Sequence, residues 1–182
     1  MLIRSAIVYG VAFSLVAAGC KDATPTGPER FTVPIFVRNA ESPNFGTHLR
    51  GDEEVPPVDT KAQGQAEFRL SDDGTSLSFK LIVANVDNVT QSHIHIGASG
   101  VNGPVVVFLF RSVAGGVTEN GILAEGTITR ANLIARPAIG FGATIGELVA
   151  AMRSGRTYVN VHTVAWPGGE VRGQLEQNGK SN

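Results

Sequence analysis

Short runs in which apolar and polar residues alternate constrain the fold of this chain more than any other feature of its sequence. Residues 66–70 alternate apolar side chains with Glu67 and Arg69, and residues 77–84 repeat the pattern after an Asp-Asp-Gly sequence at 72–74. A period of two is typical of β-strands with one buried face, because successive side chains of a strand point to opposite sides. The two runs and the turn between them predict a β-hairpin.

Further short apolar runs, separated by turn residues, predict more strands. Glycine makes up 22 of 182 residues, about 12% against a usual ~7%, which fits a chain with many turns. No alternation of strands with helices is present, which argues against a parallel α/β fold. We therefore predict an all-β fold, an antiparallel Greek-key-like sandwich or barrel of about eight strands within residues 31–182. The additional strands are expected at residues 31–37, 92–96, 105–110, 122–129, 158–163 and 171–175.

One short amphipathic helix is expected after residue 144. Thr144 and Glu147 have the spacing of a capping box, in which each side chain accepts a hydrogen bond from the other residue's backbone N–H. Apolar residues then recur at helical spacing, and Gly155 is a natural stop. We expect the resulting stripe to pack on the sheet. Its members are Ile145, Leu148, Val149 and Met152.

The N-terminal segment has the features of an export signal. Residues 1–19 carry one charge, at Arg4, followed by an apolar run that ends in small residues. Residues 17–20 read Ala-Ala-Gly-Cys, which resembles a bacterial lipobox and predicts cleavage before Cys20 and lipidation of its thiol. Residues 20–30 are polar and rich in Pro and Gly, as in a flexible tether. The prediction is an exported protein anchored in the cell envelope, in the outer or a periplasm-facing membrane. A plain secretory signal is the alternative.

Composition excludes several classes of function. The formal net charge is −1, which argues against a nucleic-acid binder. With a single cysteine, the chain has no intramolecular disulfide, Cys-based zinc site or iron–sulfur cluster. The sequence contains no nucleophile elbow and no phosphate-binding loop, and the acidic run Asp52, Glu53 and Glu54 is interpreted as a solvated loop. An enzyme is therefore not favoured, and no protein partner is identified.

Three of the four histidines form a candidate metal site. His93 and His95 lie two residues apart and share one face of a predicted strand, and His162 shares a face with Tyr158 and Asn160 on another. If these strands are close, three imidazoles converge as ligands for copper or zinc. Candidates for a fourth ligand or a supporting residue are Glu170, Asn160 and Tyr158. The alternative is a hydrogen-bonded polar cluster without metal. His48 is expected on the surface.

Several blocks of the sequence resemble the CHRD domain, a module named for chordin. The blocks lie in order between about residues 47 and 175, and they include Thr60, Ala62 and Gly64 after the first. The resemblance implies a β-rich domain of a kind that also occurs in exported bacterial proteins of unknown activity. The matching blocks are LRGDEEVPPV at 49–58, HIHIG at 93–97, NGPVV at 102–106, YVNVHT at 158–163 and PGGEVRGQL at 167–175.

Three functions follow from these observations. The first is a lipid-anchored, non-catalytic CHRD module that binds or supports another envelope component. The second is a copper- or zinc-binding protein that uses His93, His95 and His162. The third is a metal-dependent redox enzyme at the same site. The second and third require the three histidines to meet in space.

Overall fold

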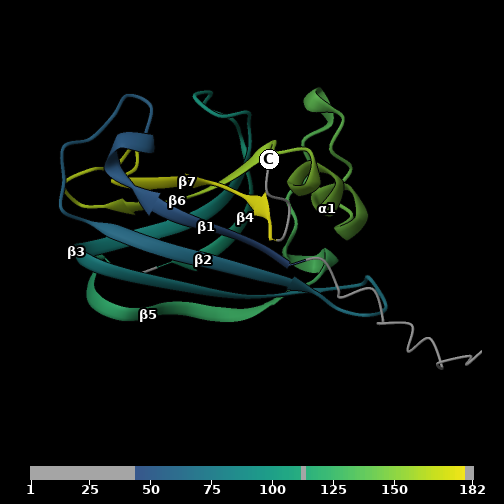
Figure 1. Cartoon of the computed structure of the whole chain (residues 1–182), viewed down its shortest axis with the longest axis horizontal. Helices are drawn as coiled ribbons and strands as arrows, with labels where there is room; N and C mark the ends of the chain where they lie inside the picture. The colour runs from purple at the N-terminus through teal and green to yellow at the C-terminus, as the bar shows by residue number, and fades with distance from the viewer. Residues whose placement is uncertain (1–43, 112–113, 179–182) are drawn as a thin grey trace, which may run out of the picture. The chain divides into compact units, whose positions relative to one another are not determined.

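The computed structural model describes residues 44–111 and 114–178, which fold around a closed ring of β-strands (Figure 1). Every strand pair is antiparallel, and the predicted all-β fold with one helix is confirmed. The strands are β1 (Asn44–Arg50), β2 (Gln63–Leu70), β3 (Leu77–Ile96), β4 (Val105–Arg111), β5 (Val117–Ile128), β6 (Thr157–Thr163), β7 (Val171–Gln174) and β8 (Glu176–Gln177).

The ring is a five-stranded barrel. Its strands follow the order β2, β1, β7, β6 and β3, and it closes where β3 pairs with β2 in the predicted hairpin. The other three strands extend it, since β4 and β5 pair with β3 and β8 pairs with β1. The one α-helix within residues 44–111 and 114–178, α1 (Ile145–Arg153), lies to the right of the strands in Figure 1. Short 3-10 helices occur at Gly51–Glu53, Arg130–Asn132 and Pro137–Ile139.

Strand β3 corrects one prediction. The runs at residues 77–84 and 92–96 are parts of one 20-residue strand. Between these runs, Asn85 and Asn88 adopt positive φ angles of 56° and 52° and accompany irregularities in the pairing with β5. Such bulges bend a strand without ending it. As a result, β3 pairs with β2 and β5 along its first half and with β6 and β4 along its second half.

Strand β1 was not expected from the sequence. Its two buried apolar residues, Phe45 and Leu49, are separated by Thr47, so the alternation is too weak to stand out. The strand nevertheless closes the barrel, because it pairs with β2 over its whole length and with β7 through Arg50 and Arg172. The extended structure of residues 44–50 therefore depends on pairing with β2 and β7.

Helix α1 confirms its predicted cap and its buried stripe. Thr144 Oγ1 accepts from the Glu147 N–H at 3.1 Å, and the Glu147 carboxylate accepts from the Thr144 N–H at 2.9 Å. Such a cap stabilises a helix by about 1 kcal/mol. The stripe packs into the hydrophobic core, and Gly155 follows the helix with a positive φ of 64°.

Several predictions concern residues outside the described part of the chain. They are the signal at residues 1–19, Cys20 with its tether, and the strand at residues 31–37. Among the residues that the structure describes, no helix is long and apolar enough to cross a membrane.

Candidate metal centre

Strands β3 and β6 present histidines on the same face of the sheet. His93 and His95 are two residues apart on β3, and the neighbouring strand β6 carries His162. The register places His93 opposite Asn160 and His162 opposite Gln91. One nitrogen from each of the three imidazoles lies within 4.8 Å of the others, and all three residues are buried. The structure therefore brings together the histidines that the sequence singled out.

The outward nitrogen of each imidazole meets a carbonyl oxygen. Because a backbone carbonyl oxygen only accepts hydrogen bonds, the outward nitrogens of His95 and His162 carry the ring proton, whereas the partner of His93 is the carboxamide of Gln91. The pairs are His95 Nδ1 to Gly103 O at 2.8 Å, His162 Nδ1 to Pro167 O at 2.9 Å, and His93 Nε2 to Gln91 Oε1 at 3.2 Å. The other ring nitrogens, which carry lone pairs, face one another across the site.

The side-chain oxygen of Asn160 lies among these nitrogens. Asn160 Oδ1 is 3.0 Å from His95 Nε2 and 3.0 Å from His162 Nε2, and His93 Nδ1 is 3.1 Å from the same His162 nitrogen. A carboxamide oxygen also accepts only. Three imidazole nitrogens and the Asn160 carboxamide are therefore gathered in one buried space. This arrangement suits a cation.

The protonation state of the imidazoles fits the same chemistry. Burial lowers the pKa of His93 to about 3, and mutual repulsion with His162 and His95 adds to the effect. Burial likewise lowers the pKa of His95 and of His162. All three rings are therefore neutral near pH 7. Neutral imidazole is the form that binds a metal ion.

The comparison with known families agrees with the blocks read from the sequence. A family model, the CHRD domain, matches residues 45–175, well over half of the chain. The chain belongs to the CHRD-domain family. The matched region includes both strands of the histidine cluster, and membership suggests a binding or structural module. A search of curated proteins found no match.

Aromatic stacking holds His95 in this CHRD domain. The Tyr158 ring lies parallel to the His95 ring, with centroids 4.6 Å apart, and the guanidinium carbon of Arg172 sits 3.4 Å from the Tyr158 centroid. The Tyr158 hydroxyl accepts a hydrogen bond from the Gly103 N–H at 3.1 Å. Tyr158 therefore packs against the candidate ligand His95 with its ring, while its oxygen contacts the backbone of Gly103. Arg172 is only 2% exposed and donates to carbonyl oxygens, including that of Val101 at 3.0 Å.

The backbone carbonyl of Gly103 lies 2.8 Å from His95 Nδ1. A Cβ at position 103 would overlap the carbonyl group of Ile96. Only glycine therefore lets the loop after β3 come close enough for the Gly103 carbonyl to accept from His95. Gly103, which belongs to the NGPVV block at residues 102–106, thus positions the imidazole of His95.

Glu170 lies away from the three imidazoles. Its carboxylate accepts from Thr60 Oγ1 at 2.7 Å and from Thr163 Oγ1 at 2.8 Å. Thr163 follows His162 on β6, and adjacent side chains of a strand point to opposite faces. Glu170 is not in the group of side chains that could share an ion with the three histidines, whereas Asn160 Oδ1 lies 3.0 Å from both His95 Nε2 and His162 Nε2.

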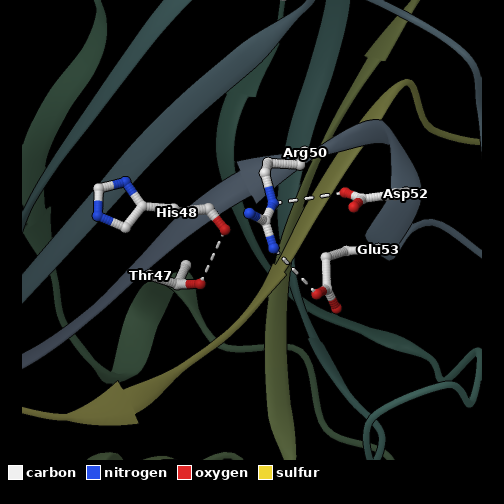
Figure 2. A network of polar contacts seen from close by, with 5 residues as sticks. All are labelled: Thr47, His48, Arg50, Asp52 and Glu53. Carbon is white, nitrogen blue, oxygen red and sulfur yellow. Dashed lines mark hydrogen bonds and ion pairs between the residues drawn. The ribbon is translucent and has the colours of Figure 1, made fainter.

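Of the three acidic residues at 52–54, two are exposed to solvent and one is buried. Asp52 and Glu53 are exposed and pair with Arg50 at 3.4 Å and 3.6 Å, as Figure 2 shows. His48, which lies on β1 together with Arg50, is exposed, as expected. Glu54 is only 5% exposed, so the interpretation of the whole run as a solvated loop is wrong for this residue. The 3-10 helix at Gly51–Glu53 turns the chain so that the next side chain points inward.

The buried Glu54 carboxyl has an unusual environment. Its Oε1 has no hydrogen-bond partner. Burial raises the pKa of Glu54 from 4.5 to about 7, although the positive charge of Arg172 opposes this shift. The sequence gives one signal for the neighbouring Glu54 and Arg172, an arginine beside Val171 in the short strand β7, which is buried and must find partners in the interior.

Proposed function

We propose that this CHRD domain binds one zinc or copper ion through His93 Nδ1, His95 Nε2 and His162 Nε2. One observation carries the proposal: the outer N–H groups of His95 and His162 donate to backbone carbonyl oxygens, which directs their other nitrogens into the cluster beside His93 Nδ1. Metal-ligating histidines almost always have such a partner, because it fixes the tautomer and the ring orientation.

The spacing of the nitrogens is compatible with one ion after an adjustment. Zinc–nitrogen bonds are ~2.0–2.1 Å long, so two ligands of a tetrahedral ion lie about 3.4 Å apart. His93 Nδ1 and His162 Nε2 are already 3.1 Å apart, and all three nitrogens lie within 4.8 Å of one another, so the widest pair closes by up to about 1.4 Å. Rotations of the side chains would provide this movement.

Burial supports a non-catalytic role for the centre. The three histidines and Asn160 are between 3% and 8% exposed. Structural zinc sites have four protein ligands, whereas catalytic sites keep one position open for water or substrate. Three imidazoles and the Asn160 oxygen supply four donors with little access for a substrate. A binding module fits this site better than a redox enzyme.

Metal loading of tag-free protein tests the proposal. We expect equilibrium dialysis against Zn²⁺ or Cu²⁺ to leave about one ion per chain, because the inward lone pairs form a single site. At an ion concentration 100 times Kd, binding stabilises the fold by about 2.7 kcal/mol. This corresponds to a rise in Tm of about 5–10 °C, reversed by a chelator. Protein that retains no ion and shows no rise in Tm would contradict the proposal.

We further propose that the protein is exported and anchored in the cell envelope by a lipid on Cys20. The sequence supports this with the apolar signal at residues 1–19, the small residues before Cys20 and the polar tether at residues 20–30. The anchor would hold the metal-binding domain at a membrane surface, facing the periplasm or the exterior.

The Cys20→Ser variant tests the anchor. We expect this variant to move from the membrane fraction to the soluble fraction, because serine has no thiol to accept the lipid and two acyl chains are sufficient for stable anchoring. The Lys21→Ser variant keeps the thiol and serves as the matched control, which should stay with membranes. Fractionation with immunodetection measures both. A Cys20→Ser protein that still sediments with membranes would overturn the lipid anchor.

A further inference from the structure

We propose that the carboxamide of Asn160 is a two-position switch that makes the bound metal exchangeable. In one position Oδ1 faces the imidazoles and ligates the ion. In the other, after a half-turn of the amide, Nδ2 donates to the same imidazole nitrogens and closes the metal-free site. The inference rests on the proposed metal binding and specifies how the centre loads and releases its ion.

The geometry of Asn160 permits both positions. Oδ1 is 3.0 Å from the Nε2 atoms of His95 and His162, so either end of the planar amide can occupy this point at hydrogen-bond distance. The amide has an acceptor at one end and two N–H donors at the other. A half-turn therefore replaces one acceptor with two donors, one for each imidazole.

The two chemical states need opposite ends of the amide. The imidazole tautomers are fixed by carbonyl partners outside the cluster, so His95 and His162 offer lone pairs inward in both states. A metal ion needs a fourth lone pair, which Oδ1 supplies. The metal-free cluster needs a donor, which only Nδ2 supplies among the side-chain atoms at hydrogen-bond distance from these nitrogens in the described part of the chain.

The backbone around Asn160 cannot move to serve the same purpose. Asn160 pairs with His93 of β3 on one side and with Arg172 of β7 on the other. Its backbone oxygen also accepts from Ser92 Oγ at 2.7 Å. Rotation of the side chain is therefore the movement that remains. Because the inward nitrogens of His95 and His162 keep a hydrogen-bond donor in the metal-free state, we expect the domain to stay folded when the ion leaves.

The Asn160→Asp variant separates the two positions. Aspartate has nearly the same shape, but an ionised carboxylate accepts only. We expect zinc affinity to rise at least tenfold, because the charge strengthens the oxygen ligand, and the Tm of metal-free protein to fall by several degrees, because the donor is lost. Asn160→Leu removes both functions, so its zinc affinity should fall about tenfold. Chelator competition and thermal unfolding measure these effects.

The wild-type protein provides a second readout that does not depend on the folding of a variant. In metal-free protein the Asn160 Nδ2 protons should show the downfield NMR shifts of amide protons bound to imidazole nitrogen, and Zn²⁺ should abolish them. Unchanged Nδ2 signals on zinc binding, or an Asn160→Asp variant with wild-type zinc affinity, would overturn the switch. Wild-type protein that binds no zinc would instead overturn the metal centre itself.

Discussion

Replacement of His93, His95 or His162 by alanine is expected to weaken zinc or copper binding at least 100-fold. Each residue supplies one inward nitrogen and nothing else at the site can replace it, since the Glu170 carboxylate is engaged by Thr60 and Thr163. Loss of an outer partner alone typically lowers metal affinity 10- to 100-fold, so loss of a direct ligand should do more. Competition with a chromophoric chelator at pH 7.5 measures the change.

The matched control for this experiment is His48→Ala. His48 is an exposed histidine on β1 and lies outside the cluster of three, so its removal should leave the affinity unchanged. Far-UV circular dichroism must show that each variant keeps its β-structure. If His48→Ala weakens binding as much as the other substitutions, or if none of them weakens it, the ligand assignment is wrong.

The Glu54→Gln variant should be more stable than the wild type at pH 8, and the gain should vanish near pH 4.5. Burial raises the pKa of Glu54 from 4.5 to about 7, so the folded state holds this proton more tightly than the unfolded state. The wild type therefore loses stability as the pH rises from about 4.5 through 7. The full shift corresponds to at most about 3 kcal/mol, and screening by water reduces the expected gain to about 2 kcal/mol.

Urea unfolding of both proteins from pH 4.5 to pH 8.5 measures this difference. The comparison between variant and wild type cancels the opposite pH dependence of the three buried histidines, whose pKa values are lowered and whose contribution to stability is lost as the pH falls below about 6.5. Glu53→Gln is the control, because Glu53 is exposed and its ion pair with Arg50 contributes less than about 1 kcal/mol. A gain for Glu54→Gln that does not change with pH would contradict the assignment.

Local patterns in the sequence predicted the parts of the fold that depend on neighbouring residues. The hairpin of β2 and β3 and the capped helix α1 follow from alternation, a turn signal and a capping box within a few residues. Strand β1 and the continuity of β3 depend on pairing with distant strands. Asn85 and Asn88 take left-handed conformations at irregularities in the pairing with β5, and β3 continues through them because it is paired before and after this segment.

The candidate site likewise has a part that local sequence patterns predict and a part that depends on distant residues. The spacing of His93 and His95 and the polar face of β6 were sufficient to identify the three histidines and Asn160. The carbonyl partners at Gly103 and Pro167 belong to loops, and no residue type marks a backbone oxygen as a hydrogen-bond acceptor in advance. Glu170 is close to His162 in the sequence, which made it a candidate fourth ligand. Its carboxylate instead accepts hydrogen bonds from Thr60 and Thr163, away from the three imidazoles.

A crystal structure of the zinc-loaded CHRD domain, with anomalous data collected at the zinc edge, tests the central claim most directly. The account predicts one strong anomalous peak within about 2.0–2.1 Å of His93 Nδ1, His95 Nε2 and His162 Nε2. It also predicts that Asn160 Oδ1 faces the same peak. A zinc peak elsewhere, for example at His48, with the three imidazoles left unligated, would contradict it.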